Sequence, residues 1–497
     1  MPTTAPEIAV VILAAGQGTR MKSTLSKVLH PIAGRPMLSY PLAAAESLSP
    51  ERIIVVVGRD ADDVRAKFEG RATFVDQTTQ RGTGHAVLQA RKALDGFRGD
   101  ILILYGDTPL LQTDALRRMA DCKAEENADL VVLTAAIDVP GIVIRGASGG
   151  VVKVVEATDA TPEELTIQER NTGVYLVGAE LLWDTLARVD DHNAQGELYL
   201  TTIVEIAVRE GRRVEALTLE DSEEALGVNT RAELAQAAAG IRRRVNQRVM
   251  ASGVTLVDPA STWIDEGVEI GPDTLIEPGC IIQGETKIGR DVHIKPHCMI
   301  ESSELGDGVV IGPSAHLRPD CVIGANSRIG NFVEVKNSRL GIGAKVDHLS
   351  YVGDADVGEK VSFGCGSIVV NYDGISKNRT TVGDRVFIGC NANLVAPVTL
   401  RDDSFVAAGS TVTQDVPEWA LAVARSRQRN VEGWVSSRAR PESKAKGVAK
   451  PTTKPPGRKK RTTKKTASKA AAKTAPGTSS RRSPKKSSPS KASKQSR

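Results

Sequence analysis

The chain has 497 residues, too many for one hydrophobic core, so we expect two or three domains. Only 3% of the residues are aromatic and 45 are glycine, which favours a repetitive β architecture in part of the chain. The net charge is +5. No C-x-x-C pair occurs, and neither a basic signal-peptide region nor a long apolar stretch is present. We therefore expect a cytoplasmic protein rather than a secreted or membrane protein.

Short β-branched apolar runs alternate with helical patterns over residues 1–229. The runs cover residues 8–13, 53–57, 101–104 and 129–134, and helical patterns lie between them, for example at 37–48 and 84–93. This alternation predicts a parallel or mixed sheet in an α/β, Rossmann-like domain. Residues 230–252 then read as one helix, ended by Gly253, that links this domain to the next.

An apolar residue recurs about every six positions in the third segment, residues 253–435. Twenty-five such positions run from Ile264 to Val412, with occasional slips of one residue and one longer gap at 370–381. Neither a helix nor a flat strand has this period, whereas a triangular solenoid places one inward-pointing residue on each side. We therefore predict a β-helix of about eight coils, with the polar segment 370–381 ejected as a loop.

The last segment, residues 436–497, is strongly basic. It holds 21 Lys and Arg and one acid, Glu442, whereas the rest of the chain holds 44 bases and 59 acids. Rich in Lys, Ser, Thr, Ala and Pro, and without aromatic residues, it cannot bury enough apolar surface to fold. We expect a disordered tail that binds nucleic acid or another polyanion, or that is merely solvated.

A glycine-rich turn follows the first predicted strand, at residues 13–21. Glycine lets backbone N–H groups approach phosphate oxygens, and Arg20 and Lys27 can neutralise the phosphate charge. The turn is neither a Walker loop nor a dinucleotide fingerprint, and taken alone it could be an ordinary strand–helix turn.

Further motifs give this turn a context. Residues 13–21 with 27–29, Gln77 with 82–86, and 105–110 resemble the signature, base-holding and metal-binding stretches of sugar-1-phosphate nucleotidylyltransferases. Residues 193–199 and 227–229, together with the hexapeptide pattern, narrow the resemblance to the bacterial family of bifunctional N-acetylglucosamine-1-phosphate uridylyltransferase/glucosamine-1-phosphate N-acetyltransferases. The resemblance covers about residues 5–434 and implies a left-handed β-helix.

The resemblance implies a site for UTP, a sugar phosphate and Mg²⁺ in the first half. Asp107 and Asn229 would ligate one or two Mg²⁺ ions, since carboxylate and amide oxygens suit a hard cation. The sugar phosphate would attack the α-phosphorus of UTP, a step that needs positioning and charge neutralisation more than a protein nucleophile. The residues assigned to this site are Leu13, Ala14, Ala15, Gly16, Arg20, Lys27, Gln77, Gly82, Thr83, Tyr105, Gly106, Asp107, Gly141, Glu156, Asn171 and Asn229.

In the second half, the resemblance implies transfer of an acetyl group from acetyl-CoA to glucosamine-1-phosphate. His348 would be the base that removes a proton from the amine, since the reference pKa of histidine, about 6.5, lies near the working pH. The sugar phosphate would be held by Arg318, Lys336, Tyr351, Ser362 and Lys377, and acetyl-CoA by Cys365, Asn371, Tyr372, Cys390, Ala408 and Arg425. The family forms trimers, with active sites between neighbouring β-helices.

The chain departs from the family pattern in both halves. Ser26 replaces a proline, residues 141–145 replace a longer glycine-rich turn near the sugar, and Thr202 replaces an acid. In the β-helix, Ser362 replaces an amide, Cys365 a small residue and Cys390 a serine. Altered N-acetylglucosamine affinity or rate is expected from the changed turn at 141–145, and a looser sugar site from Ser362. Cys390 would lie close to the thiol arm of the coenzyme.

Three alternatives remain at this point. The chain could be a different sugar nucleotidylyltransferase with a regulatory β-helix, although His348 and Lys336 argue against this. It could be a non-catalytic scaffold, although Asp107 and Asn229 argue against that. The tail could also make it a nucleic-acid-associated protein in which catalysis is secondary.

Overall fold

The computed structural model describes residues 7–58, 61–147, 149–435 and 437–438. Contacts divide the chain into two compact units, Met1–Arg427 and Gln428–Arg497. Nearly all of the predicted tail lies outside the described residues, so its predicted disorder and its binding to polyanions stay predictions. Among the described residues no helix is both long and apolar enough to cross a membrane.

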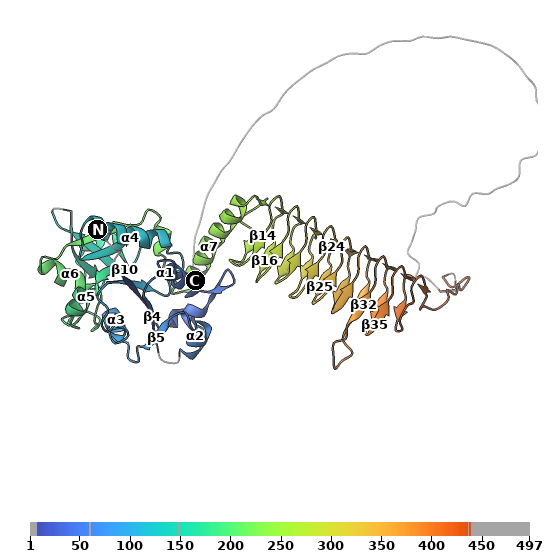
Figure 1. Ribbon diagram of the computed structural model, residues 1–497, viewed down its shortest axis with the longest axis horizontal. Coiled ribbons are helices and arrows are strands. Elements are labelled where there is room, and N and C mark those ends of the chain that lie inside the picture. The colour runs from blue at the N-terminus through green and yellow to red at the C-terminus, as the bar shows by residue number, and fades with distance from the viewer. Residues whose placement is uncertain (1–6, 59–60, 148, 436, 439–497) are drawn as a thin grey trace, which may run out of the picture. The chain divides into compact units, whose positions relative to one another are not determined.

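The first half of unit Met1–Arg427 contains a mixed sheet (Figure 1). The strand order is β11-β7-β10-β6-β1-β4-β5, and β10 runs antiparallel to both of its neighbours. The bounds are β1 Ile8–Ala14, β4 Arg52–Val57, β5 Thr73–Asp76, β6 Asp100–Tyr105, β7 Leu130–Ala135, β10 Arg170–Gly178 and β11 Val214–Thr218. A hairpin of β8 Gly141–Arg145 and β9 Val151–Glu156 pairs with β10, and β2 Pro31–Ile32 pairs with β3 Arg35–Pro36. The four predicted strands are confirmed to within two residues at each end.

Helices cover both faces of this sheet, which explains why its central strands are apolar throughout. One core joins Val11 of β1 to helices α3, α5 and α6, and the other joins Ile12 to α1, α2 and α4. The helices are α1 Ser39–Glu46, α2 Asp62–Lys67, α3 Thr83–Gln89, α4 Thr113–Glu125, α5 Ala179–Leu186 and α6 Thr202–Arg209, with short 3₁₀ turns at Thr19–Met21, Lys27–Leu29, Glu164–Thr166 and Ser222–Ala225.

The predicted linker helix is α7, Arg231–Ala251. A capping box starts it: the Thr230 hydroxyl accepts from the Glu233 N–H, and the Glu233 carboxylate accepts from the Thr230 N–H at 2.7 Å. Gly240 lets the helix approach the α/β half closely, because a Cβ there would lie 2.8 Å from Leu110 Cδ2. Near its other end, Asn246 donates to the Thr262 carbonyl of the first coil at 3.1 Å.

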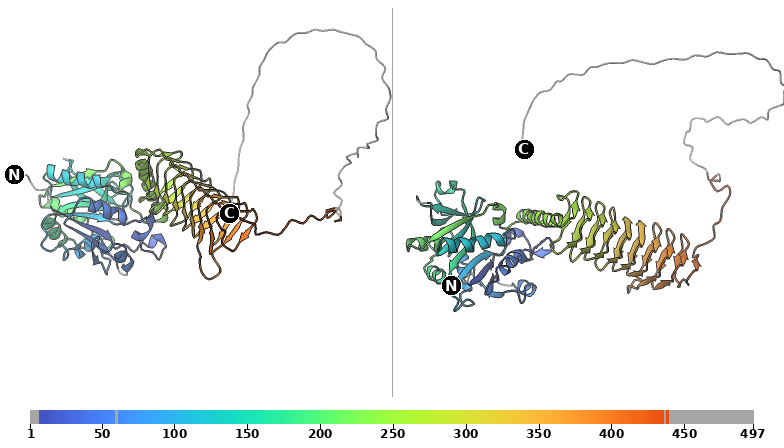
Figure 2. Two further views of the ribbon diagram at one scale, coloured as in Figure 1. Left: turned by 45° about the vertical axis from the view of Figure 1, so that its right-hand side comes forward. Right: turned by 45° about the horizontal axis from the view of Figure 1, so that its top comes forward.

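Strands β12 to β38 form a left-handed parallel β-helix with three faces (Figure 2). The first face contains β12 Thr255–Leu256, β15 Leu275–Ile276, β18 His293–Ile294, β21 Val310–Ile311, β24 Arg328–Asn331, β27 Lys345–His348, β30 Ser362–Phe363, β33 Phe387–Ile388, β36 Phe405–Val406 and β38 Leu421–Ala422. The second contains β13 Trp263–Ile264, β16 Ile281–Gln283, β19 Met299–Glu301, β22 His316–Leu317, β25 Glu334–Lys336, β28 Tyr351–Gly353, β31 Ile368–Val370, β34 Asn393–Val395 and β37 Thr411–Val412. The third contains β14 Glu269–Ile270, β17 Lys287–Ile288, β20 Glu304–Leu305, β23 Val322–Ile323, β26 Arg339–Leu340, β29 Ala355–Val357, β32 Thr380–Val382 and β35 Val398–Leu400.

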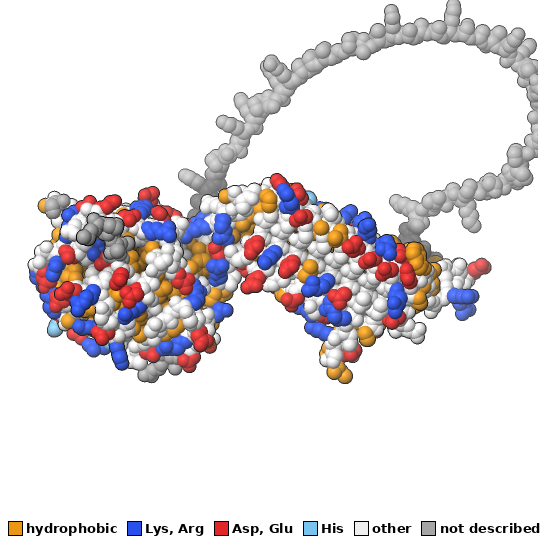
Figure 3. All heavy atoms as spheres, viewed as in Figure 1, with side chains coloured by type: hydrophobic (Ala, Val, Ile, Leu, Met, Phe, Trp, Pro, Cys, Tyr) orange, Lys and Arg blue, Asp and Glu red, His pale blue; other side chains and the backbone are white. Residues whose placement is uncertain are grey.

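The six-residue pattern marks the interior of this β-helix. All twenty-five predicted inward positions are buried except Ile270, in an early coil, which is only partly buried. The predicted loop leaves the β-helix after β31, and Ile375 at its tip is 92% exposed. It ends earlier than predicted, because Thr380 and Thr381 already belong to β32. On the side seen in Figure 3, acidic and basic side chains intermingle over the outer surface.

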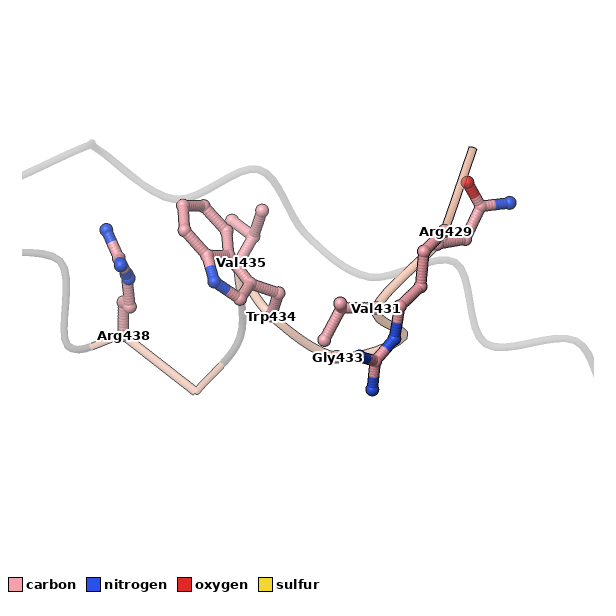
Figure 4. A pocket seen from close by; sticks show the side chains of 7 residues that line it. Arg429, Val431, Gly433, Trp434, Val435 and Arg438 are labelled. Atoms are coloured by element: carbon pink, nitrogen blue, oxygen red, sulfur yellow. The ribbon is translucent and has the colours of Figure 1, made fainter. Parts of the chain in front are cut away.

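The described part of the second unit is a short segment around a hollow of about 970 Å³ (Figure 4). The Arg438 guanidinium lies 3.8 Å from the centroid of the Trp434 ring. The hollow is lined by Arg429, Asn430, Val431, Gly433, Trp434, Val435 and Arg438. None of the predicted site residues belongs to it.

Candidate functional site

A cavity of about 230 Å³ opens where β1 and β6 end, at their carboxyl ends. Ligands of open α/β sheets bind at this edge. The lining residues are Leu13, Ala14, Ala15, Gly16, Lys27, Val28, Gln77, Gln80, Gly82, Thr83, Ala86, Tyr105, Asp107 and Glu197. Ten of these are predicted site residues. A second cavity of about 470 Å³ shares the 14–16 backbone, Lys27 and Gln77, and extends toward Ser26 and Asp63.

Side-chain hydrogen bonds hold the loops around this cavity. Gln77 donates to the Gly82 carbonyl at 3.1 Å, and Gln80 donates to the Ala15 carbonyl at 2.6 Å. Gly82 has φ +100°, and a Cβ there would lie 2.6 Å from the Leu198 carbonyl oxygen, so only glycine fits. Gln80 is not among the predicted site residues, because its contact with a residue 65 positions away leaves no local pattern in the sequence.

The two predicted metal ligands converge on one cation. Lys27 Nζ contacts the Asp107 carboxylate and lies 3.0 Å from Asn229 Oδ1. The Asp107 carbonyl also accepts from the Val228 N–H at 2.8 Å, which ties the two loops together. The described residues contain no cluster of three or more His, Cys, Asp or Glu suited to a metal. The oxygens of Asp107 and Asn229 fit Mg²⁺, provided that phosphate and water oxygens complete the coordination shell.

Tyr105 lies close to Glu156, another residue that the resemblance assigns to this site. Burial raises the pKa of Glu156, and Asp159 and Glu197 add to this, against a hydrogen bond from Thr201. Burial raises the pKa of Tyr105 as well, as do the charges of Asp107 and Glu156. A site that disfavours additional negative charge is suited to a neutral sugar ring.

The Asn171 side chain makes two internal hydrogen bonds. Its amide donates to the Tyr175 hydroxyl at 2.7 Å, and its oxygen accepts from the Gly173 N–H at 3.0 Å. Gly141 packs against it, since a Cβ at Gly141 would lie 3.0 Å from Asn171 Cβ. Residues 141–145 form strand β8 here, with Gly141 paired to Glu156, so this segment is a strand and not a turn.

Two other predicted residues of the first half, Arg20 and Gly106, do not line the cavity. Arg20 is exposed on the 3₁₀ turn Thr19–Met21. Gly106 permits close packing behind the cavity, because a Cβ there would lie 3.1 Å from Ala14 Cβ and 3.2 Å from Leu38 Cδ1.

In the β-helix, parallel register stacks several predicted residues along one corner. Val346, Phe363, Ile388 and Val406 pair in succession on the first face, and the residue two positions after each continues the stack. We call this stack, Asn331, His348, Cys365, Cys390 and Ala408, the edge column. His348 Nδ1 and Asn331 Oδ1 lie 2.6 Å apart. Asn331 has no predicted role, although the coil period places it directly next to His348.

A cationic cluster lies on the adjoining second face. Arg318 and Lys336 flank paired positions of β22 and β25, and Arg318 Nη1 donates to Glu334 Oε1 at 3.0 Å. Lys377, on the ejected loop, is close enough to lower the pKa of Lys336, an effect that partial burial increases and Asp354 opposes. Glu334 and Asp354 lie against two of these three cations, and three converging cations form a surface suited to a phosphate.

Asp354 organises the side chains around this cluster. It is 4% exposed and accepts from Asn337 Nδ2 at 2.5 Å and from Asn371 Nδ2. Burial would raise the pKa of Asp354, but these two hydrogen bonds and the nearby lysines lower it. Asn371 also lies 3.4 Å from the Tyr351 hydroxyl. Asp354 has no predicted role either, and only the folded coil shows that it contacts the predicted residues Lys336 and Asn371.

The remaining predicted residues lie around these two groups. Ser362 begins β30, paired with Lys345 and Phe387 of the adjacent coils. Tyr372 is 56% exposed on the ejected loop, and its hydroxyl donates to the Gly374 carbonyl at 2.7 Å. Arg425 packs near the last coil, with its Cδ 3.9 Å from where a Cβ of Gly409 would lie.

Comparisons with known proteins cover both halves. Residues 10–197 match the model of the MobA-like NTP transferase domain. Residues 267–302 and 302–337 match the bacterial transferase hexapeptide model, and residues 379–414 match the hexapeptide repeat of succinyl-transferase.

Similar full-length proteins match nearly the whole folded chain. A bifunctional protein GlmU of Pelobacter propionicus is 47% identical over 449 residues, which is 86% of this chain and 98% of that protein. The GlmU proteins of Caldanaerobacter subterraneus and Thermoanaerobacter pseudethanolicus are 47% and 46% identical, each over 87% of this chain and 98% of their own length. Because single relatives match both halves, the alternatives of a regulatory β-helix and a non-catalytic scaffold lose their support. The chain therefore belongs to the GlmU family, the bifunctional transferases that carry out acetyl transfer to glucosamine-1-phosphate and uridylyl transfer to N-acetylglucosamine-1-phosphate in UDP-N-acetylglucosamine synthesis.

Proposed function

We propose that uridylyl transfer takes place in the cavity at the ends of β1 and β6, and acetyl transfer between the edge column and the cationic cluster of the β-helix. The observation that carries this proposal is the convergence of Lys27, Asp107 and Asn229 on one point of that cavity. Two hard oxygens and an ammonium cation are the groups that a triphosphate with its metal requires.

In the first site, we assign binding and orientation to the protein and charge neutralisation to Lys27 and Mg²⁺. The backbone at 13–16 and the side chain of Gln77 hold UTP, while Glu156 and Asn171 position the sugar. Mg²⁺, held by Asp107 and Asn229, supplies positive charge for the phosphates when it is bound. Attack of the sugar phosphate on the α-phosphorus then expels pyrophosphate.

In the second site, His348 accepts the proton of the attacking amine. When Nδ1–H donates to Asn331 Oδ1, the Nε2 lone pair stays free to take that proton. Arg318, Lys336 and Lys377 hold the sugar phosphate, and the amine attacks the thioester carbonyl of acetyl-CoA, from which the thiol leaves. The acetyl-CoA arm lies along the edge column past Cys365, Cys390 and Ala408.

We propose three further properties that rest on family resemblance or composition. The β-helix assembles as a homotrimer, and the protein works in the cytoplasm. Residues 436–497, with 21 bases against one acid, bind nucleic acid or another polyanion without sequence preference. Retention on DNA at low salt should fall when the chain is ended at residue 435, and equal retention of both forms would exclude a role for the tail.

The central experiment supplies the purified protein with glucosamine-1-phosphate, acetyl-CoA, UTP and Mg²⁺ and identifies the products by mass. N-acetylglucosamine-1-phosphate, pyrophosphate and UDP-N-acetylglucosamine are expected. Omitting acetyl-CoA should stop product formation, and adding N-acetylglucosamine-1-phosphate should restore the second step. If the folded protein forms no acetylated sugar phosphate, the proposed acetyl-transfer site is wrong. If it forms no UDP-N-acetylglucosamine from added N-acetylglucosamine-1-phosphate, the proposed uridylyl-transfer site is wrong.

A further inference from the structure

Two cysteines occupy consecutive positions of the edge column. Phe363 pairs with Ile388, which places Cys365 and Cys390 one coil apart, and the Asn391 N–H donates to the Cys365 carbonyl at 2.8 Å. Cys365 is half-buried and Cys390 is exposed. The pair therefore consists of two thiols at least one of which meets solvent.

Side chains of the edge column can reach one another across coils. His348 and Asn331, one coil apart in the same column, are in hydrogen-bond contact at 2.6 Å. The residue after each member takes the left-handed conformation, with φ of +49° at Leu349, +74° at Gly366 and +54° at Asn391. The backbone therefore makes the same turn directly after each of these column members. Paired strands lie about 4.8 Å apart, which is inside the Cα separation of about 4.4–6.8 Å that a disulfide requires.

A second stacked pair of cysteines provides an internal contrast. Ile282 pairs with Ile300, so Cys280 and Cys298 are also one coil apart. These two are 0% and 1% exposed, inside the β-helix. The members of both pairs are therefore one coil apart, and the two pairs differ in whether a dissolved reagent can reach them.

We infer that Cys390 and Cys365 form an oxidisable dithiol at the acetyl-transfer site, the substrate being a low-molecular-weight disulfide. The Cys390 thiolate attacks one sulfur of the disulfide, forms a mixed disulfide and expels one thiolate, which takes up a proton. The Cys365 thiolate then attacks the Cys390 sulfur and expels the second thiolate. In total, two protein thiols are oxidised to one disulfide, and the reagent is reduced to two thiols.

The consequence for activity rests on the proposed function. The new S–S bond lies in the column next to His348, along the path proposed for the acetyl-CoA arm. Oxidation should therefore stop acetyl transfer and leave uridylyl transfer unchanged, and a dithiol reductant should restore the lost activity. The disulfide of coenzyme A should react faster than a small neutral disulfide, because the proposed site binds the coenzyme.

The test uses full-length protein carrying Cys122→Ser, which removes the one other cysteine that is not buried. Reduced protein is treated with coenzyme A disulfide or with bis(2-hydroxyethyl) disulfide, and intact mass and peptide maps are recorded. The expected product lacks two hydrogen atoms, carries no adduct and links the peptides of Cys365 and Cys390. Adding Cys365→Ser should trap the adduct on Cys390, and adding Cys390→Ser should prevent the reaction.

Each alternative result overturns a defined part of the inference. A stable adduct on the Cys122→Ser protein, no reaction at all, or a link between Cys280 and Cys298 would overturn the dithiol. If the link between Cys365 and Cys390 forms but acetyl transfer continues, the dithiol stands and the proposed place of the acetyl-transfer site is wrong. Equal rates with both reagents would contradict coenzyme binding at the edge column and would leave the dithiol itself standing.

Discussion

Replacing Asp354 with asparagine tests whether this buried carboxylate positions the acetyl-transfer site. Both carboxylate oxygens accept hydrogen bonds from amides, at Asn337 and Asn371, and Lys336 Nζ lies 3.9 Å away. The asparagine has the same shape but only one acceptor, so one amide must face another donor. A hydrogen bond to a charged group contributes about 1.5–3 kcal/mol, which corresponds to a loss of about 10- to 150-fold in acetyltransferase kcat/KM.

The assay measures acetyl transfer against glucosamine-1-phosphate concentration. KM should rise more than kcat falls, because the cluster that Asp354 organises binds the sugar phosphate. Asp356→Asn, two residues after Asp354, is the matched control. It removes an exposed ion pair between Asp356 and Arg379, and such pairs contribute about 0–1 kcal/mol. Uridylyl transfer should stay unchanged in both variants. Unchanged kcat/KM in Asp354→Asn, or an equal loss in Asp356→Asn, would refute the positioning role.

Three other predictions concern the two sites. Asp107→Ala should abolish uridylyl transfer and spare acetyl transfer, and His348→Ala should do the reverse; loss of both activities in one folded variant would show that the sites are not independent. Lys27→Met should lower uridylyl transfer but strengthen Mn²⁺ binding in the absence of nucleotide, because the ammonium that contacts Asp107 is gone. Electron paramagnetic resonance measures this binding, and weaker or equal binding would mean that Lys27 does not compete with the metal. Because the pKa of Glu156 is raised in the folded state, the contribution of Glu156 to wild-type stability should be largest below its unfolded pKa, about 4.3, and should be lost as pH rises through the folded pKa. Glu156→Gln should lose this part of the pH dependence in thermal melts while losing uridylyl transfer, and superimposable melting curves would disprove the assignment.

The sequence by itself determined the repeating part of the fold. A period of six with one apolar residue per side has one regular solution, and the inward positions from Ile276 to Val412 are all buried. Local signals also located α7, which begins at a capping box and ends near Gly253, and the polar loop that carries Ile375. These features are predictable because each depends on neighbouring residues or on a pattern that repeats along the chain.

Only the tertiary structure decided which side chains meet. The contact of Lys27 with Asp107 spans 80 residues and that with Asn229 spans 202, and no local pattern encodes either. The antiparallel insertion of β10 between β6 and β7, and the role of Asp354 as a shared acceptor, also depend on pairing across coils or strands. Local propensity and periodicity fix the element and its buried face, whereas the partner of a polar side chain is set by the packing of segments far apart in the chain.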